Sequence, residues 1–356
     1  MSRAPTRRFA MSAALSLGLA APALAQGRQQ WRMVTSWGRD QPGPGTSARR
    51  LAERITKLSG GAIEVKVFAA GDIVPALGVF DAVGNGTAQM GHSASFFWAG
   101  KIAAAPIFTS LPFGLTPVEH SAFLLHGGGQ GLWDGLYRPY NVKPFAGGNT
   151  GPSLGGWFNR PIHGVDDFKG LKIRVPGLGG EMFRRLGALP VLTAPSDIVA
   201  NLRSGVIDAA EFLGPWADLA QGFHQAARYY LWPGVTKPNG SSEALIALDV
   251  WQALNGEMKA VVEAACEAES HAGLAEAEWW NARTLEVMVR RYGVQLAALP
   301  DAVLLSLRAA AEEAVEALAS RDQAARLVLE AYHAVRQPAL AWSRASLQAF
   351  LRARNG

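Results

Sequence analysis

Strand-like and helix-like patterns alternate along the early part of the chain, and this alternation limits the folds that it can adopt. Three short segments alternate apolar and polar residues or run apolar, as strands do. Two segments between them carry apolar residues at helical spacing. In chain order, the five segments are residues 31–37, 46–58, 63–67, 76–84 and 89–94. An order of strand, helix, strand, helix and strand indicates a parallel sheet with helices on its faces.

A second set of such patterns lies between residues 150 and 240. Strands are expected at 171–175 and 209–213, with short helices at 179–187 and 196–204. From Asp249 the sequence is mostly helical to the C terminus, with a break expected near Gln337-Pro338. We therefore expect an α/β protein with two lobes and long C-terminal helices. Lobe I comprises 26–149 with part of 240–356, lobe II comprises 150–240, and the helical region 250–356 packs on the lobes or reaches a partner subunit.

The N-terminal segment has the composition of an export signal. Arg3 and the Arg7-Arg8 pair make it basic, residues 10–20 are small and apolar, and Ala23-Leu24-Ala25 forms an A-x-A cleavage site. The apolar run is too short to span a bilayer. Residues 1–25 are therefore predicted to be a signal peptide and the mature protein to be periplasmic. The arginine pair partly fits a twin-arginine signal, which leaves the general and twin-arginine export routes both open.

Charge and cysteine content exclude several classes of function. The formal net charge is +5 and falls to about +2 without the arginines of the signal, which gives no reason to expect nucleic acid binding. A second hydrophobic run of membrane length is absent, so the mature chain is expected to be soluble. Cys266 is the single cysteine, which excludes a disulfide or a cysteine–metal site within the chain.

One pair of motifs is typical of serine hydrolases. Gly151-Pro152-Ser153-Leu154-Gly155 fits G-x-S-x-G, and His126-Gly127-Gly128-Gly129 fits a lipase oxyanion loop. A nucleophile elbow needs a helix directly after the serine, and the glycines and Pro161 that follow Ser153 oppose one. Asp218 and His224 could complete a triad in sequence order. A serine esterase that uses Ser153 and the His126 loop is thus the alternative from another functional class.

Arg174 and Glu211 are the charged residues best placed to bind a ligand. Each lies where a predicted strand ends, and open α/β sheets bind ligands at the carboxyl ends of their strands. The planar fork of an arginine matches a carboxylate with two parallel hydrogen bonds. Arg174 could equally be an ordinary arginine paired with Asp or Glu. If Glu211 is buried opposite Arg174, it needs a cation or the arginine itself as partner.

Aromatic residues are concentrated around the two turns that flank these strands. They are Phe96, Phe97, Trp98, Trp157, Phe212 and Trp216. Such residues belong to the core more often than to a ligand site, but their crowding here favours a cleft lined by some of them.

Several motifs together resemble a known family over about residues 30–350. They are 33–37 (MVTSW), 91–94 (GHSA), 149–158 (NTGPSLGGWF), 167–174 (DFKGLKIR), 202–209 (LRSGVIDA) and 211–215 (EFLGP). The chain resembles the periplasmic solute-binding subunits of TRAP transporters, especially the α-keto-acid and lactate binders. The resemblance implies a type II-like periplasmic binding protein with its ligand cleft between two lobes.

The resemblance also implies roles for individual residues. Arg174 matches the arginine that binds the substrate carboxylate in that family. In the keto-acid binders, a bridging cation, Na⁺ or Ca²⁺, is bound by a glutamate, the backbone carbonyl of the next residue and a glutamine. Glu211 matches that glutamate, Phe212 stands where tryptophan is usual, and Ser153 stands in the place of the glutamine. Glu243 matches another acidic position near the ligand. The candidate substrate-binding residues are Arg174, Asn149, Ser153, Phe97, Trp157, Phe212 and Trp216, and the candidate metal ligands are Glu211, Phe212, Glu243 and Ser153.

We therefore expect a non-catalytic binding protein that delivers a small organic acid to the membrane subunits of a TRAP transporter. A short 2-oxo or 2-hydroxy monocarboxylate is the first candidate. A larger apolar acid is the other, because serine for glutamine and phenylalanine for tryptophan both open space. Service as the ligand subunit of a sensor is a further option. The resemblance also implies a possible homodimer formed by exchange of a C-terminal helix.

Overall fold

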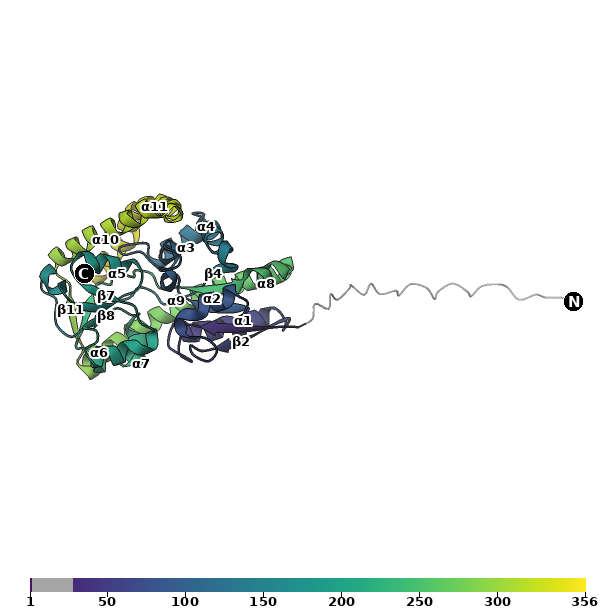
Figure 1. The fold of residues 1–356 in the computed structure, drawn as a ribbon, viewed down its shortest axis with the longest axis horizontal. Helices are drawn as coiled ribbons and strands as arrows, with labels where there is room; N and C mark the ends of the chain where they lie inside the picture. Colours follow the sequence, from purple (N-terminus) through teal and green to yellow (C-terminus); the bar gives the residue numbers. More distant parts are fainter. Residues whose placement is uncertain (2–27) are drawn as a thin grey trace.

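A computed structural model of the protein describes Met1 and residues 28–356. Apart from Met1, the predicted signal peptide lies outside the described residues. Two mixed sheets, each covered by helices, lie at opposite ends of the molecule (Figure 1). The predicted α/β architecture with long C-terminal helices is confirmed.

The first sheet has the strand order β2-β1-β3-β10-β4. Its first three strands in sequence pair in parallel, and α1 (Pro44–Leu58) and α2 (Val79–Gly84) connect them, as the early alternation predicts. β10 comes from much later in the chain and runs antiparallel between β3 and β4. The strands are β1 (Gln29–Thr35), β2 (Ile63–Phe68), β3 (Met90–Ser93), β4 (Val142–Asn149) and β10 (Ser241–Ala247).

The second sheet has the order β11-β9-β5-β8-β6-β7. Its strands are β5 (Gly156–Phe158), β6 (Lys172–Arg174), β7 (Leu189–Val191), β8 (Ala209–Ala210), β9 (Tyr229–Trp232) and β11 (Gln295–Ala298). Its helices are α5 (Leu178–Arg185), α6 (Ile198–Arg203) and α7 (Pro215–Gln221). β8 is shorter than the strand expected over 209–213, because Gly214 caps α7 and Pro215 begins it.

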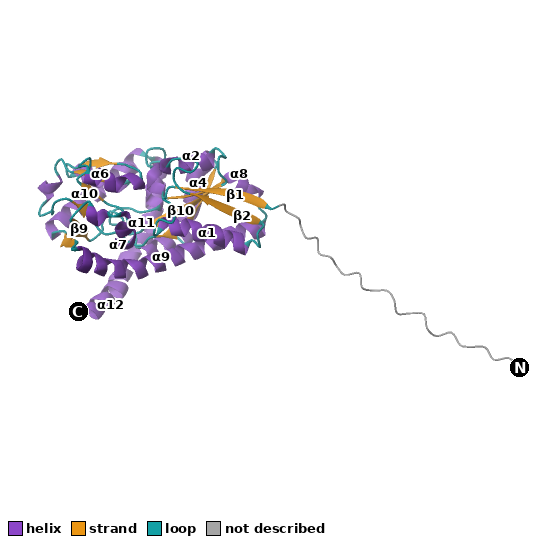
Figure 2. Cartoon of the chain, turned by 90° about the horizontal axis from the view of Figure 1, so that it is seen from below, coloured by secondary structure: helices purple, strands orange, loops and turns teal. Residues whose placement is uncertain are grey.

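The long C-terminal helices pack against elements of both sheets. α9 (Gly256–Tyr292) runs beneath both (Figure 2) and packs against β4, α1 and α7. α10 (Asp301–Arg321) packs on α5 beside the second sheet, and α11 (Gln323–Ser343) packs on α3 (Pro117–Leu125) beside the first. The shorter helices are α3 (Pro117–Leu125), α4 (Gly129–Tyr137), α8 (Leu248–Ala253) and α12 (Ala349–Asn355).

The break expected near Gln337-Pro338 is wrong. Pro338 lies inside α11, and the helix changes only at residues 344–348, which form a π-helical turn. Pro338 and Gln337 are exposed, so water can satisfy the carbonyl that loses its helical partner at the proline. None of the helices in residues 28–356 combines the length and the hydropathy that crossing a bilayer requires.

Candidate functional site

Arg174 is a buried cation with an unused hydrogen-bond donor. It ends β6, and its exposed fraction is 2%. Its Nη1 donates to the backbone carbonyl oxygen of Glu211 at 2.9 Å, while its Nε has no partner among the described residues. The guanidinium carbon lies 6.0 Å from the ring centre of Phe212. Burial lowers the pKa of Arg174 to about 10, which leaves the side chain charged at neutral pH.

Strand pairing explains why Arg174 and Glu211 meet. β6 and β8 are parallel neighbours, with Arg174 opposite Ala210. The amide of Glu211 continues this ladder by donating to the carbonyl oxygen of Arg174 at 2.9 Å. Both residues therefore leave the sheet at the same edge, as the strand-end argument predicts.

The carboxylate of Glu211 pairs with Lys237 rather than with Arg174. Lys237 Nζ lies 3.0 Å from Glu211 Oε1, and both side chains are at most 5% exposed. The same ammonium donates to the backbone carbonyl oxygen of Phe212. No ion pair joins Arg174 to a carboxylate within the part of the chain that the structure describes. Lys237 is a site residue that the sequence argument misses, because it stands in a loop without periodicity, just before Pro238.

A narrow cavity lies where these groups face the first sheet. Its volume is about 20 Å³, which is room for about one water molecule. Arg174, Phe212 and Lys237 line it from one side, and Phe97 lines it from the other. The remaining lining residues are Trp37, Pro44, Ala94, Phe96, Thr109, Thr150, Leu213, Gly240, Ser241 and Ser242. The cavity thus lies between elements of the two sheets, and at this volume an organic acid fits only when these elements separate.

Ser153 is buried, and both of its hydrogen-bond donors bind the loop that contains Lys237. Its amide and its hydroxyl both donate to the backbone carbonyl oxygen of Lys237, each at 3.1 Å. The residues that follow form β5 and not a helix, so the nucleophile elbow is absent, as the glycines predicted. His126 is an exposed residue at the end of α3, and no hydrogen bond joins it to Ser153 among the described residues. The esterase alternative therefore finds no support.

Two other candidates from the sequence support this region without lining the cavity. Asn149 ends β4, donates to Asn239 Oδ1 at 2.8 Å and accepts from the amide of Gly151. Trp157 stacks on Tyr230 with ring centres 4.1 Å apart, and its Nε1 donates to Asp218 at 2.8 Å.

The last two candidates lie apart from the cavity. The ring of Trp216 stacks on Trp280 of α9. Glu243 accepts hydrogen bonds from Trp98 Nε1 and, at 3.0 Å, from the hydroxyl of Tyr137. Burial raises the pKa of Glu243 to about 8. Its carboxyl group is thus part of the buried interior of the first sheet, and the structure does not bring it to Glu211.

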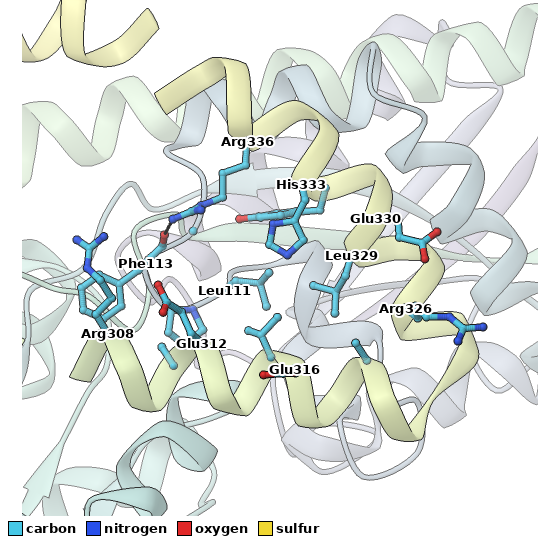
Figure 3. A pocket seen from close by; sticks show the side chains of 16 residues that line it. Leu111, Phe113, Arg308, Glu312, Glu316, Arg326, Leu329, Glu330, His333 and Arg336 are labelled. Carbon is cyan, nitrogen blue, oxygen red and sulfur yellow. Dashed lines mark hydrogen bonds between the residues drawn. The ribbon is translucent and has the colours of Figure 1, made fainter. Parts of the chain in front are cut away.

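A larger groove lies between α10, α11 and residues 111–114 (Figure 3). Its volume is about 330 Å³, but Glu312, Glu316 and Arg326 on its walls are exposed. Arg336 on its wall is half-buried and already donates to the carbonyl oxygen of Phe113 at 3.1 Å. The groove lacks a buried charge like that of Arg174, so the small cavity is the better candidate for binding an ion.

Comparison with known proteins gives consistent matches over nearly the whole described chain. A profile of bacterial extracellular solute-binding proteins, family 7, matches residues 33–322. The monocarboxylate 2-oxoacid-binding periplasmic protein of Nostoc sp. PCC 7120 is 35% identical over 317 residues, which cover 88% of this chain and 86% of the relative.

Solved structures agree with this match. A TRAP periplasmic solute-binding protein from Pseudoalteromonas atlantica, with bound sodium and pyruvate, has a TM-score of 0.89 and 31% identity, covering 92% of this chain and 99% of its own. One from Colwellia psychrerythraea, with calcium and pyruvate, gives the same score, identity and coverage of this chain, and is covered over 100% of its length. A third, from Bordetella bronchiseptica, also has a TM-score of 0.89 and 31% identity over 92% of this chain and 97% of its own. It is a mixed-occupancy dimer with calcium and picolinate in its occupied site. The predicted fold of a two-lobed binding protein is confirmed.

Proposed function

The chain belongs to family 7 of the bacterial extracellular solute-binding proteins, and we propose that it captures a short 2-oxo or 2-hydroxy monocarboxylate for a TRAP transporter. The family is one of solute-binding proteins, so we further propose that the chain carries out no catalysis. The Nostoc relative is a periplasmic protein, which supports delivery of this chain to the periplasm by the N-terminal signal.

The observation that carries this proposal is the unpaired charge of Arg174. The carboxylate of Glu211 favours the charged form of Arg174 but pairs with Lys237, so one buried negative charge faces two buried positive charges, and burial of the unused Nε of Arg174 adds to the cost. A carboxylate in the cavity would supply the missing negative charge and accept a charge-assisted hydrogen bond. Closing the lobes over such a ligand would remove water from the pair and strengthen it.

The second feature of the proposed ligand comes from Lys237. The similar structure from Pseudoalteromonas atlantica contains pyruvate, and the one from Bordetella bronchiseptica contains picolinate. Both ligands carry a polar atom on the carbon next to the carboxylate. In this chain, Arg174 and Lys237 line one cavity and offer two separate sets of donors. We therefore favour acids with an oxo or hydroxyl oxygen at carbon 2. The volume of about 20 Å³ favours a short acid over the larger apolar one, because the lobes need to separate less to admit it.

Two further elements of the proposal concern partners. TRAP membrane subunits would receive the ligand, as for other binding proteins of this kind. A homodimer is proposed on two grounds. The similar structure from Bordetella bronchiseptica is a dimer. In this chain, Leu347 and Phe350 near the C terminus are exposed apolar residues. Exchange of the C-terminal helix between two copies would cover them.

Calorimetry of the purified protein tests the proposed function. Pyruvate, lactate and 2-oxobutyrate are expected to bind, whereas propionate, which lacks the second oxygen, should bind more weakly. Succinate carries a second negative charge and should also bind weakly. Titrations run with and without sodium and calcium that detect no binding of any of these monocarboxylates would refute the proposal.

A further inference from the structure

Lys237 places a positive charge between two oxygen atoms of the candidate site. Its Nζ lies 3.0 Å from Glu211 Oε1 and donates to the carbonyl oxygen of Phe212. The side chain is 5% exposed and lines the same cavity as Arg174. These two oxygens are the ones that the resemblance assigns to a bound cation.

The residues of this chain do not fit a metal ion at that point. Sodium and calcium prefer several oxygen ligands, and calcium binds them at about 2.3–2.6 Å. An ion so close to both oxygens would meet the ammonium of Lys237, a like charge that is hydrogen-bonded to the carbonyl oxygen of Phe212 and lies 3.0 Å from Glu211 Oε1. The third expected ligand is also changed, because Ser153 has a shorter side chain than the glutamine and its hydroxyl is held against the backbone of Lys237. Within residues 28–356, no cluster of three His, Cys, Asp or Glu side chains offers another metal site.

We propose that the ammonium of Lys237 takes the place of the metal ion, so that this protein binds its ligand without sodium or calcium. An ammonium has three donors. One donates to the carbonyl oxygen of Phe212, the charge lies 3.0 Å from Glu211 Oε1 as an ion pair, and a donor remains for the oxo or hydroxyl oxygen of the ligand. Arg174 then holds the carboxylate. This inference rests on the proposed function and specifies how that same site is built.

The loop around Lys237 is anchored on both sides, which holds the ammonium in place. Ser153 fixes the lysine backbone with two hydrogen bonds to its carbonyl oxygen. Two residues later, Asn239 donates to the carbonyl oxygen of Thr109 at 2.8 Å and accepts from Asn149 at 2.8 Å. A charge held by fixed neighbours loses little freedom when the ligand binds, which favours affinity.

The first test uses the wild-type protein. It is stripped of metals with a chelator, dialysed into choline chloride, and titrated with pyruvate by calorimetry. Addition of sodium or calcium chloride is expected to leave the dissociation constant unchanged. A dissociation constant that improves only when sodium or calcium is present overturns the inference.

The second test removes the ammonium. Lys237→Met keeps the apolar stem and should weaken metal-free pyruvate binding by about 100-fold, as loss of one partner of a buried charge pair does. Lys237→Gln restores an amide oxygen and should regain affinity when calcium is added, a response that a purely structural lysine would not produce. Lys172→Met is the matched control, because Lys172 Nζ also donates to a backbone carbonyl, that of Gly205, but at the surface. A Lys237→Met protein that binds as tightly as the wild type overturns the inference.

The two proposals fail in different ways. If the wild type binds no monocarboxylate under any ion condition, the proposed function itself is wrong. If it binds only with sodium or calcium, the function stands and the role of Lys237 is wrong. Should either Lys237 variant fail to fold, as judged by its circular dichroism, the metal titration of the wild type decides the matter.

Discussion

Arg174 donates to the backbone carbonyl oxygen of Glu211, not to its carboxylate, which lies 3.0 Å from Lys237 Nζ. One glutamate thus contacts two buried cations through different atoms. The charge of Lys237 is balanced inside the protein, whereas that of Arg174 is left for a ligand. This division of roles is the basis of the binding predictions.

Replacement of Arg174 should abolish ligand binding. Arg174→Ala removes the proposed partner of the carboxylate and is expected to weaken pyruvate binding by about 3 kcal/mol or more, as measured by calorimetry. Lys172→Ala, on the same strand but with its ammonium at the surface, should bind like the wild type. Equal affinities of the wild type and Arg174→Ala would contradict the assignment.

Ser153 should stabilise the loop that contains Lys237 and should not act as a nucleophile. Ser153→Ala loses the hydroxyl bond to the carbonyl oxygen of Lys237 but keeps the amide bond to the same atom. We expect a loss of about 1 kcal/mol in the free energy of unfolding, measured with denaturant. A fluorophosphonate probe should not label the wild-type protein, and covalent labelling of Ser153 would revive the esterase alternative.

Space at Phe97 should control ligand length. Phe97 lines the cavity and packs edge-on against Phe96, with ring centres 4.7 Å apart. Phe97→Ala enlarges the cavity, so the affinity for 2-oxohexanoate should rise relative to that for pyruvate. The ratio of the two dissociation constants is the measurement, and it corrects for any general loss of stability. An unchanged ratio would show that this side chain does not face the ligand.

Glu269 should be important for the position of the long helix α9. It is fully buried, and its carboxylate accepts from Arg50 at 2.7 and 2.8 Å and from Ser47 at 2.6 Å. Glu269→Ala leaves Arg50 without this partner and should lower the free energy of unfolding by about 3 kcal/mol. Glu53→Ala is the control, because its pair with Arg49 is exposed and should contribute about 0.5 kcal/mol or less. Similar losses for both variants would refute the argument.

Glu243 should make stability depend on pH. Burial raises its pKa to about 8 in the folded state, above its ordinary value of 4.5. Between these values the unfolded chain releases a proton that the folded chain keeps. Stability should therefore fall as pH rises from about 4.5 to 8, by up to about 1.4 kcal/mol per pH unit from this group.

Glu243→Gln isolates this contribution. The amide cannot ionise, so its stability curve should be flatter than that of the wild type over the same pH range. Asp218, with a pKa raised by burial to about 6, and His92, with a pKa lowered by burial to about 4, titrate in both proteins and cancel in the difference. Parallel curves from chemical denaturation at several pH values would contradict the prediction.

Local patterns predicted much of the fold. The order of strands and helices in residues 31–94 follows from periodicity, which depends only on near neighbours in the chain. The strand-end rule correctly placed Arg174 and Glu211 at one edge of a sheet. The same reasoning failed at Pro338, because α11 continues through this exposed proline. Helix propensity alone does not show whether water can hydrogen-bond to the backbone carbonyl that the proline leaves without a partner.

The sequence by itself determined the α/β class, the family motifs and the two strand-end residues, since each is written in contiguous stretches of the chain. Only the tertiary structure decided which side chain pairs with the carboxylate of Glu211. Lys237 stands in a loop whose path depends on hydrogen bonds to Ser153 and, through Asn239, to Thr109. Such long-range hydrogen bonds produce no periodic pattern in the sequence. The ammonium of Lys237 beside Glu211 can therefore be identified only from the tertiary structure.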